Sequence, residues 1–214
     1  MKDTFRHKGL RQKLVETIRE KGIRDEKVLE AIGRIPRHLF MDSSFVQFAY
    51  KDQAFPIDAG QTISQPYTVA FQTELLQVKK HDKVLEVGTG SGYQAAVLLE
   101  LGAKVYTIER HRELYLKSRS LLTKMGYKPY SFYGDGYEGN ERYSPYDKII
   151  VTAGAPKIPE SLLKQLKPGG RMVVPVGGNG GQVMKLLVKD QENNYKITQH
   201  GSFVFVPLLK GKNS

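Results

Sequence analysis

The feature that most constrains the fold is a regular alternation of short apolar segments and amphipathic segments that begins at Pro66. Strands separated by helices form a mostly parallel sheet with helices on both faces, a doubly wound α/β fold. The last two strands have no helix between them, which predicts an antiparallel hairpin with the polar turn 190–194 at its tip. The predicted strands are 83–87, 104–108, 130–133, 147–152, 171–176, 183–189 and 195–206, and the predicted helices are 66–78, 91–101, 111–125 and 159–166.

The residues before Pro66 follow a different pattern. Residues 1 to about 50 predict helices, with Asp25 as an N-cap and Pro36 ending the second helix. Residues 51–66 predict a long loop, and a loop of this length in a compact domain is usually functional. We therefore divide the chain into an N-terminal helical extension with a substrate loop (1–65) and a core (66–214), forming one compact unit.

Composition narrows the class of protein. The chain has 214 residues, of which 40% are hydrophobic, so a real core is expected. It has no cysteine, which excludes disulfides, thiolate metal sites and a cysteine nucleophile. No apolar run approaches the roughly 20 residues of a membrane helix, and no secretory signal is visible, so we expect a cytoplasmic protein without membrane contact. The net charge of +11 comes from lysines spread along the chain, which favours a solvated surface over a nucleic-acid site.

A glycine-rich turn is the strongest local signal for a ligand. Gly88, Gly90 and Gly92 follow the strand 83–87 and open the next helix. Glycine lets the backbone turn tightly and approach a ligand closely. The spacing is G-x-G-x-G, whereas dinucleotide-binding proteins carry G-x-G-x-x-G.

Acidic residues end three successive strands near this turn. Glu109 lies about 20 residues past the turn, where a carboxylate accepts hydrogen bonds from a ribose diol. Glu86 precedes the first glycine and is placed to take a ligand ammonium, directly or through water. Asp135 is placed to accept from an adenine amino group, and Gly136 allows close backbone approach. The carboxyl ends of parallel strands are the ligand-binding edge of such sheets, so these residues predict a binding site.

This arrangement resembles the class I S-adenosylmethionine-dependent methyltransferases over about residues 80–180. The resemblance implies a Rossmann-like sheet of about seven strands. It also implies S-adenosylmethionine as methyl donor and S-adenosylhomocysteine as product.

Further motifs narrow the resemblance to one family. The segment 60–66, Gly-Gln-Thr-Ile-Ser-Gln-Pro, looks like the signature of the protein-L-isoaspartate (D-aspartate) O-methyltransferases. Matching stretches run in order along the chain, which makes the resemblance far more specific than a glycine turn. The chain departs from the family at Asp58, where the family usually carries glycine, and more mildly at Gly154. The further matching stretches are 34–40, 146–156, 166–177 and 205–208.

The resemblance implies that Ser64 is the catalytic serine, acting on the carboxylate of L-isoaspartyl residues, and on D-aspartyl residues if these are accepted, in damaged proteins. Such a carboxylate has a pKa near ~4 and is already ionised at neutral pH, so no general base is needed and positioning supplies most of the catalysis. A structural alternative for Ser64 is the N-cap of the helix that follows. Thr62 and Ile63 are expected to flank the cofactor, and Val206 and Pro207 to line a peptide groove.

Other readings stay open at this point. The acceptor could be RNA or a small-molecule carboxylate, the cofactor a nicotinamide dinucleotide, or the chain a non-catalytic S-adenosylmethionine-binding module. The histidines are scattered without metal-ligand spacing, so no metal is expected. We expect a monomer that does not bind nucleic acid. Asn179-Gly180 is a pair of the kind that deamidates, which makes self-methylation a hypothesis.

Overall fold

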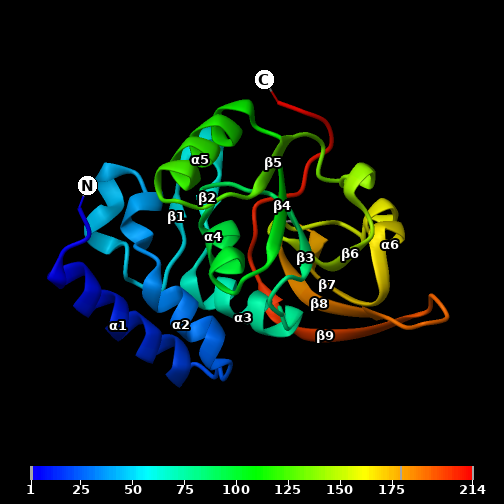
Figure 1. The fold of residues 1–214 in the computed structure, drawn as a ribbon, viewed down its shortest axis with the longest axis horizontal. Coiled ribbons are helices and arrows are strands. Elements are labelled where there is room, and N and C mark those ends of the chain that lie inside the picture. Colours follow the sequence, from blue (N-terminus) through cyan, green and yellow to red (C-terminus); the bar gives the residue numbers. More distant parts are fainter. Residues whose placement is uncertain (1, 179, 214) are drawn as a thin grey trace.

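Figure 1 shows the fold of the chain in a computed structural model, which describes residues 2–178 and 180–213. Its centre is a seven-stranded sheet with the strand order β5-β4-β3-β6-β7-β8-β9. The sequence prediction of a mostly parallel α/β sheet is confirmed. The strands are β3 (Lys83–Val87), β4 (Lys104–Glu109), β5 (Tyr130–Tyr133), β6 (Tyr146–Val151), β7 (Leu166–Gly178), β8 (Gly181–Lys189) and β9 (Tyr195–Phe203).

The strand pairing explains where a ligand site can form. The five strands from β5 to β7 are parallel, whereas β8 and β9 are antiparallel and extend the sheet as the predicted hairpin. The chain runs outward from β3 through β4 to β5 and then crosses back to β6 on the other side of β3. The carboxyl ends of β3, β4 and β6 therefore meet at the point where the strand order reverses, which is where open α/β sheets bind ligands.

Helices cover both faces of this sheet (Figure 1). A large apolar cluster packs the N-terminal helices and the helices after β2 and β3 against one face. A second cluster on the other face includes Leu162 of the short helix α6 and Leu208 of the C-terminal tail. The helices are α1 (Phe5–Glu20), α2 (Glu26–Arg34), α3 (Pro66–Leu76), α4 (Tyr93–Glu100), α5 (Arg112–Lys124) and α6 (Glu160–Gln165).

The N-terminal region forms the two expected helices. Asp25 caps α2, because its carboxylate accepts from the backbone N–H of Lys27 at 2.9 Å. The same apolar cluster contains residues of α1 and α2 together with residues of the central strands. The core is therefore continuous across residue 65, and the division proposed there stays a prediction.

The segment 51–66 differs from the prediction. It was expected to be a loop, but Phe55–Pro56 (β1) and Thr62–Ile63 (β2) pair as a small antiparallel hairpin. A short 3-10 turn, Asp58–Gly60, closes the hairpin, with Ala59 in the left-handed region at φ 56°. Strands of two residues are too short to show alternation, so the sequence carried no signal for them.

The start of β7 also differs from the prediction. Pro168-Gly169-Gly170 was expected to separate a helix from a strand at 171, but β7 already begins at Leu166. Leu166 pairs with Tyr146, and the register then shifts before Arg171 pairs with Lys148. An irregular strand start of this kind accommodates proline and glycine. Asn179 lies outside the described residues, so the deamidation hypothesis stays a prediction. No helix of the described ranges is long and apolar enough to cross a membrane.

Candidate active site

The glycine turn lies at the carboxyl end of β3, between β4 and β6. The N–H of Gly88 donates to Ile108 O at 2.9 Å, and the Thr152 hydroxyl donates to Gly88 O at 2.6 Å. Gly88 has φ 95°, and a Cβ atom on it would lie 2.6 Å from the Thr152 hydroxyl. Glycine is therefore required here both for conformation and for space. Gly92 is likewise in the left-handed region, at φ 87°, and a Cβ on it would lie 3.1 Å from Leu122 of α5.

Glu109 organises this turn. Its side chain is 4% exposed at the end of β4. One carboxylate oxygen accepts from Gly90 N at 2.8 Å, and the other accepts from His111 N at 2.9 Å. A carboxylate offers about four lone-pair positions, so about two remain for a diol. The predicted ribose partner is thus fixed in place and still able to accept hydrogen bonds.

The other two predicted acids lie differently. Glu86 is fully buried within β3, and it does not line the cleft described below. Burial raises the pKa of Glu86 to about 8, the Thr107 hydroxyl opposes the rise, and the charge of Glu109 adds to it. The carboxylate of Asp135 accepts from Tyr137 N at 2.8 Å and from Gly211 N of the C-terminal tail at 2.6 Å. A role of either acid toward the cofactor stays a prediction.

Two hollows meet beside Ser64. A narrow cleft follows the edge of the sheet from Glu109 to Ser64, and a wider groove runs from Ser64 along the end of β9. Ser64 is half-buried, and its hydroxyl has no hydrogen-bond partner among the residues that the structure describes. The residues that line both hollows are Thr62, Ser64, Thr152 and Val206. A hydroxyl at this junction can reach a ligand in either hollow.

Most predicted contact residues line these hollows. Ile63 and Pro207 line the cleft, together with Gly88, Gly90 and Gly136. The structure therefore brings the loop 61–64, the glycine turn and residues 206–209 together. The alternative role of Ser64 as a helix cap is wrong, because Gln65 occupies the N-cap position of α3. The Tyr67 N–H of α3 is instead bound by Asp52, at 2.8 Å.

The lining of the cleft fits S-adenosylmethionine. Glu109 offers acceptors for a ribose diol, and the glycine backbone leaves room for a ligand to approach closely. Ile108, Leu208 and Leu209 supply an apolar wall for a planar base. One backbone N–H of the turn, that of Gly90, is already bound by the Glu109 carboxylate and is not free for a pyrophosphate.

Comparison with known proteins decides the family. Residues 9–213 match the model of the protein-L-isoaspartate(D-aspartate) O-methyltransferase family. The chain belongs to that family. It is 64% identical to a protein-L-isoaspartate O-methyltransferase of Christiangramia forsetii over the full length of both chains. It is 58% identical to one of Flavobacterium psychrophilum, again over the full length of both. The resemblance predicted from the motifs is confirmed.

Solved structures agree on the fold. One protein-L-isoaspartate O-methyltransferase superposes with a TM-score of 0.79 at 31% identity, covering 92% of this chain and 65% of the other. A protein from Plasmodium falciparum, described as a possible member of the family in complex with S-adenosyl-L-homocysteine, superposes with a TM-score of 0.80 at 22% identity. That match covers 94% of this chain and 99% of the other. The predicted methyltransferase fold is confirmed.

Asp52 contacts the residues that follow Ser64, and the sequence did not single it out. Its side chain is only 6% exposed. Besides Tyr67 N, its carboxylate accepts from Gln65 Nε2 at 2.9 Å and from Lys21 Nζ at 2.5 Å. These bonds hold the residues on the C-terminal side of Ser64 against α1. The partners of Asp52 are 13 or more residues away in the chain, so no local pattern could have revealed them.

Asp58, which replaces the usual glycine of the family, has a place in the structure. The left-handed conformations of its turn fall on Ala59 and Gly60 and not on Asp58. Asp58 forms an ion pair with Lys117 of α5. The backbone of the turn therefore accommodates Asp58, and the side chain joins the β1–β2 hairpin to α5 above the glycine turn.

Proposed function

We propose that this enzyme methylates the free carboxylate of L-isoaspartyl residues in proteins, and that Ser64 holds this carboxylate for the transfer. S-adenosylmethionine is the methyl donor, and it supplies an activated methyl group. Family membership and the two full-length relatives support the activity. The observation that carries the role of Ser64 is its position at the junction of cleft and groove.

The methyl transfer needs few catalytic groups from the protein. The acceptor carboxylate has a pKa near ~4 and is ionised at neutral pH, so the site needs no base to create the nucleophile. The Ser64 hydroxyl donates one hydrogen bond and adds no charge. A hydroxyl held in one place orients the acceptor oxygen, and orientation of this kind can supply most of the rate gain in a one-step displacement. The ester then closes to a succinimide when the neighbouring backbone amide nitrogen attacks the ester carbonyl and methanol leaves, without a second catalytic group.

The groove suits an extended peptide. It is lined by Phe71, Phe203 and Phe205 and by the backbone around residues 200–206. The Phe71 and Phe203 rings lie 5.2 Å apart. The strand β9 is at the edge of the sheet, so its outer backbone groups are free of sheet pairing within the described chain. Main-chain recognition along such an edge tolerates many sequences, as a repair enzyme requires.

The activity is tested with paired peptides that differ only in containing aspartate or isoaspartate at one position. We expect release of S-adenosylhomocysteine with the isoaspartyl peptide and none above background with the aspartyl peptide. An RNA of mixed sequence serves as a third acceptor. Methylation of RNA without methylation of the isoaspartyl peptide would overturn the proposal.

The role of Ser64 is tested with Ser64→Ala. A hydrogen bond to a charged group contributes about 1.5–3 kcal/mol, so kcat should fall roughly 10- to 150-fold. The Kd for S-adenosylhomocysteine should change little, because only the acceptor contact is removed. Ser202→Ala is the matched control, since Ser202 is exposed and lines the groove away from the junction. Weakened cofactor binding with unchanged kcat in Ser64→Ala would contradict the assignment.

We also propose that the enzyme is a cytoplasmic monomer that does not bind nucleic acid. The spread of lysines along the chain supports the absence of nucleic-acid binding, because it gives no run of basic residues. Light scattering after gel filtration tests the oligomeric state, and a gel-shift assay at physiological salt tests nucleic-acid binding.

A further inference from the structure

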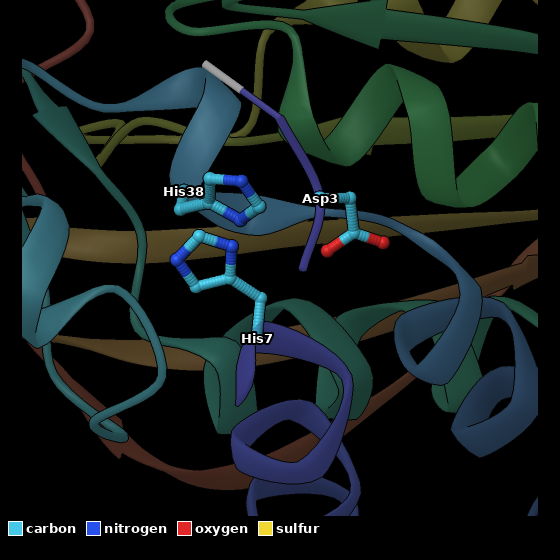
Figure 2. A group of neighbouring side chains, drawn as sticks. All are labelled: Asp3, His7 and His38. Carbon is cyan, nitrogen blue, oxygen red and sulfur yellow. The ribbon is translucent and has the colours of Figure 1, made fainter. Parts of the chain in front are cut away.

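A group of three potential metal ligands lies in the N-terminal region, apart from the active site. Figure 2 shows Asp3, His7 and His38 facing one another. One ligand atom from each residue lies within 4.8 Å of the other two. Asp3 precedes α1, His7 is in its first turn, and His38 is in the 3-10 turn Arg37–Phe40. None of the three is among the residues that line the cleft or the groove.

The strongest evidence for a ligand is an unsatisfied ring nitrogen of His38. Its side chain is 0% exposed. Its Nδ1 lies 2.7 Å from the Tyr50 hydroxyl, whereas its Nε2 is buried without a hydrogen-bond partner among the described residues. A buried ring nitrogen without a partner is rare in native proteins and costs stability. A cation at Nε2, with Nδ1–H donating to Tyr50, satisfies both nitrogens.

The other two ligands are held by surrounding hydrogen bonds. Thr4 N donates to His7 Nδ1 at 3.3 Å, so Nδ1 is the unprotonated nitrogen of His7. A metal ion would bind His7 at Nδ1 in place of this long bond, or at Nε2 after the proton moves to Nδ1. Arg11 donates to both oxygens of Asp3, at 3.2 and 3.0 Å. A carboxylate offers about four lone-pair positions, so each oxygen of Asp3 can still accept a cation. Metal ligands oriented by such outer partners are the usual arrangement in proteins.

A purely structural reading explains only part of this cluster. The Arg11–Asp3 ion pair and the capping of α1 by Thr4 and His7 fasten the start of the chain without any ion. Neither contact involves His38 Nε2, which lacks a hydrogen bond of ordinary length within the described chain, although the backbone of Lys2 lies close to the His38 ring. The His7 and His38 rings lie with their centroids 3.9 Å apart, which places a second imidazole beside the first.

We propose that Asp3, His7 and His38 form a binding site for a first-row divalent metal ion, with Zn²⁺ as the preferred ion. Two imidazoles and one carboxylate suit Zn²⁺, whereas Mg²⁺ and Ca²⁺ prefer oxygen ligands throughout. Zn–N bonds of about 2.0–2.1 Å place tetrahedral ligand atoms about 3.4 Å apart. The ligand atoms lie within 4.8 Å of one another, so they must close by up to about 1.4 Å. Asp3 is exposed, so its side chain has room for this movement.

The site joins the segment before α1 to the turn that follows α2. Arg11 offsets the charge of Asp3, which keeps the expected affinity moderate. The fourth position of the ion is left to water. The sequence analysis expected no metal, because His7 and His38 are far apart in the chain and Asp3 was not considered beside them. The fold supplies the proximity that the spacing lacks.

The test uses the full-length chain without a histidine tag and without added residues before Met1, since an N-terminal tag would supply ligands of its own. The protein is treated with chelator, dialysed and titrated with Co²⁺, whose visible absorption reports ligand geometry. Zn²⁺ is then added as a competitor. We expect one Co²⁺ per chain, displacement by Zn²⁺, and a Zn²⁺-dependent rise in Tm.

Two variants assign the ligands, and both change partly exposed residues so that folding is preserved. Outer partners of metal sites already contribute 10- to 100-fold to affinity, so His7→Ala and Asp3→Asn should each weaken binding by at least about tenfold. His200→Ala is the control and should bind as the parent does, because His200 lies on β9 in the groove. Absence of stoichiometric binding in the parent, or unchanged affinity in either His7→Ala or Asp3→Asn, overturns the proposal.

Discussion

Replacement of Glu86 by glutamine should stabilise the cofactor-free enzyme at neutral pH. Glu86 is buried in the middle of the sheet, paired in register with Thr107 of β4 and Ile150 of β6. Both of its carboxyl oxygens lack a hydrogen-bond partner among the described residues, and the Thr107 hydroxyl lies 2.5 Å from that of Thr89. A charge in this position is strongly disfavoured, and glutamine keeps the shape without the charge.

The sign and size follow from the pKa of Glu86, which burial raises from 4.5 to about 8. Between these two values the folded chain holds a proton that the unfolded chain has released, so the free energy of unfolding falls as pH rises. The slope is about 1.4 kcal/mol per pH unit. Relative to low pH, the free energy of unfolding is therefore lower by about 1 kcal/mol at about pH 5 and by about 3 kcal/mol at about pH 7. Above pH of about 8 the loss stays constant, and well below 4.5 it vanishes.

Urea denaturation of the cofactor-free protein at a series of pH values measures this difference. The Glu86→Gln variant should exceed the parent by about 3 kcal/mol near neutrality and by about 1 kcal/mol at the acidic end, with an unchanged m-value. Glu20→Gln, at an exposed position in the last turn of α1, is the control and should show no such trend. A difference that does not change with pH would refute the reasoning, because it would mean that the folded protein holds an ionised carboxylate.

Two further predictions concern the site. Glu109→Ala removes an acceptor that binds Gly90 N and His111 N besides the predicted diol, so the Kd for S-adenosylhomocysteine should rise roughly 10- to 150-fold in calorimetry. Exposed Glu113→Ala is the control, and an unchanged Kd in Glu109→Ala would exclude Glu109 from binding. Asp52→Ala leaves Tyr67 N without its acceptor and removes one of the two acceptors of Gln65 Nε2. Urea denaturation should therefore show a loss of about 1–3 kcal/mol, and kcat should fall more than cofactor affinity. Asp52→Asn, which keeps one acceptor oxygen, should recover part of kcat; equal kcat in the alanine variant and the parent would contradict a positioning role.

Local patterns predicted the central sheet well. The bounds of β3 and β5 agree with the prediction because each is a short run bounded by polar residues or glycine. The capping of α2 by Asp25 was also predicted from the sequence, because the cap and the N–H group that it binds are only two residues apart. Features that depend on residues far apart in the chain could not be predicted from local sequence patterns. The β1–β2 hairpin and the early start of β7 are fixed by packing and strand register, which leave no periodic signal.

The position of Glu86 shows what a prediction from position in the sequence leaves out. The sequence places Glu86 one residue before the end of β3, close to the glycine turn. Side chains of a strand alternate between its faces, so Glu86 lies on the same face as Val84, which packs in the cluster beneath the helices. The sequence predicted the edge of the sheet correctly, but it did not reveal that Glu86 is fully buried and is not among the residues that line the cleft.

The three acids of the predicted site differ in how many hydrogen-bond acceptor positions are free and in whether these face the cleft. Glu109 has accepted two backbone N–H groups and still lines the cleft with unused lone pairs. Asp135 has also accepted two backbone N–H groups and keeps as many lone pairs, but it is not among the residues that line the cleft. Glu86 has accepted none and is buried away from the cleft. Affinity for the nucleoside should therefore depend most on Glu109, because its carboxylate is already oriented by the backbone that forms the turn and binding requires no bond to be broken.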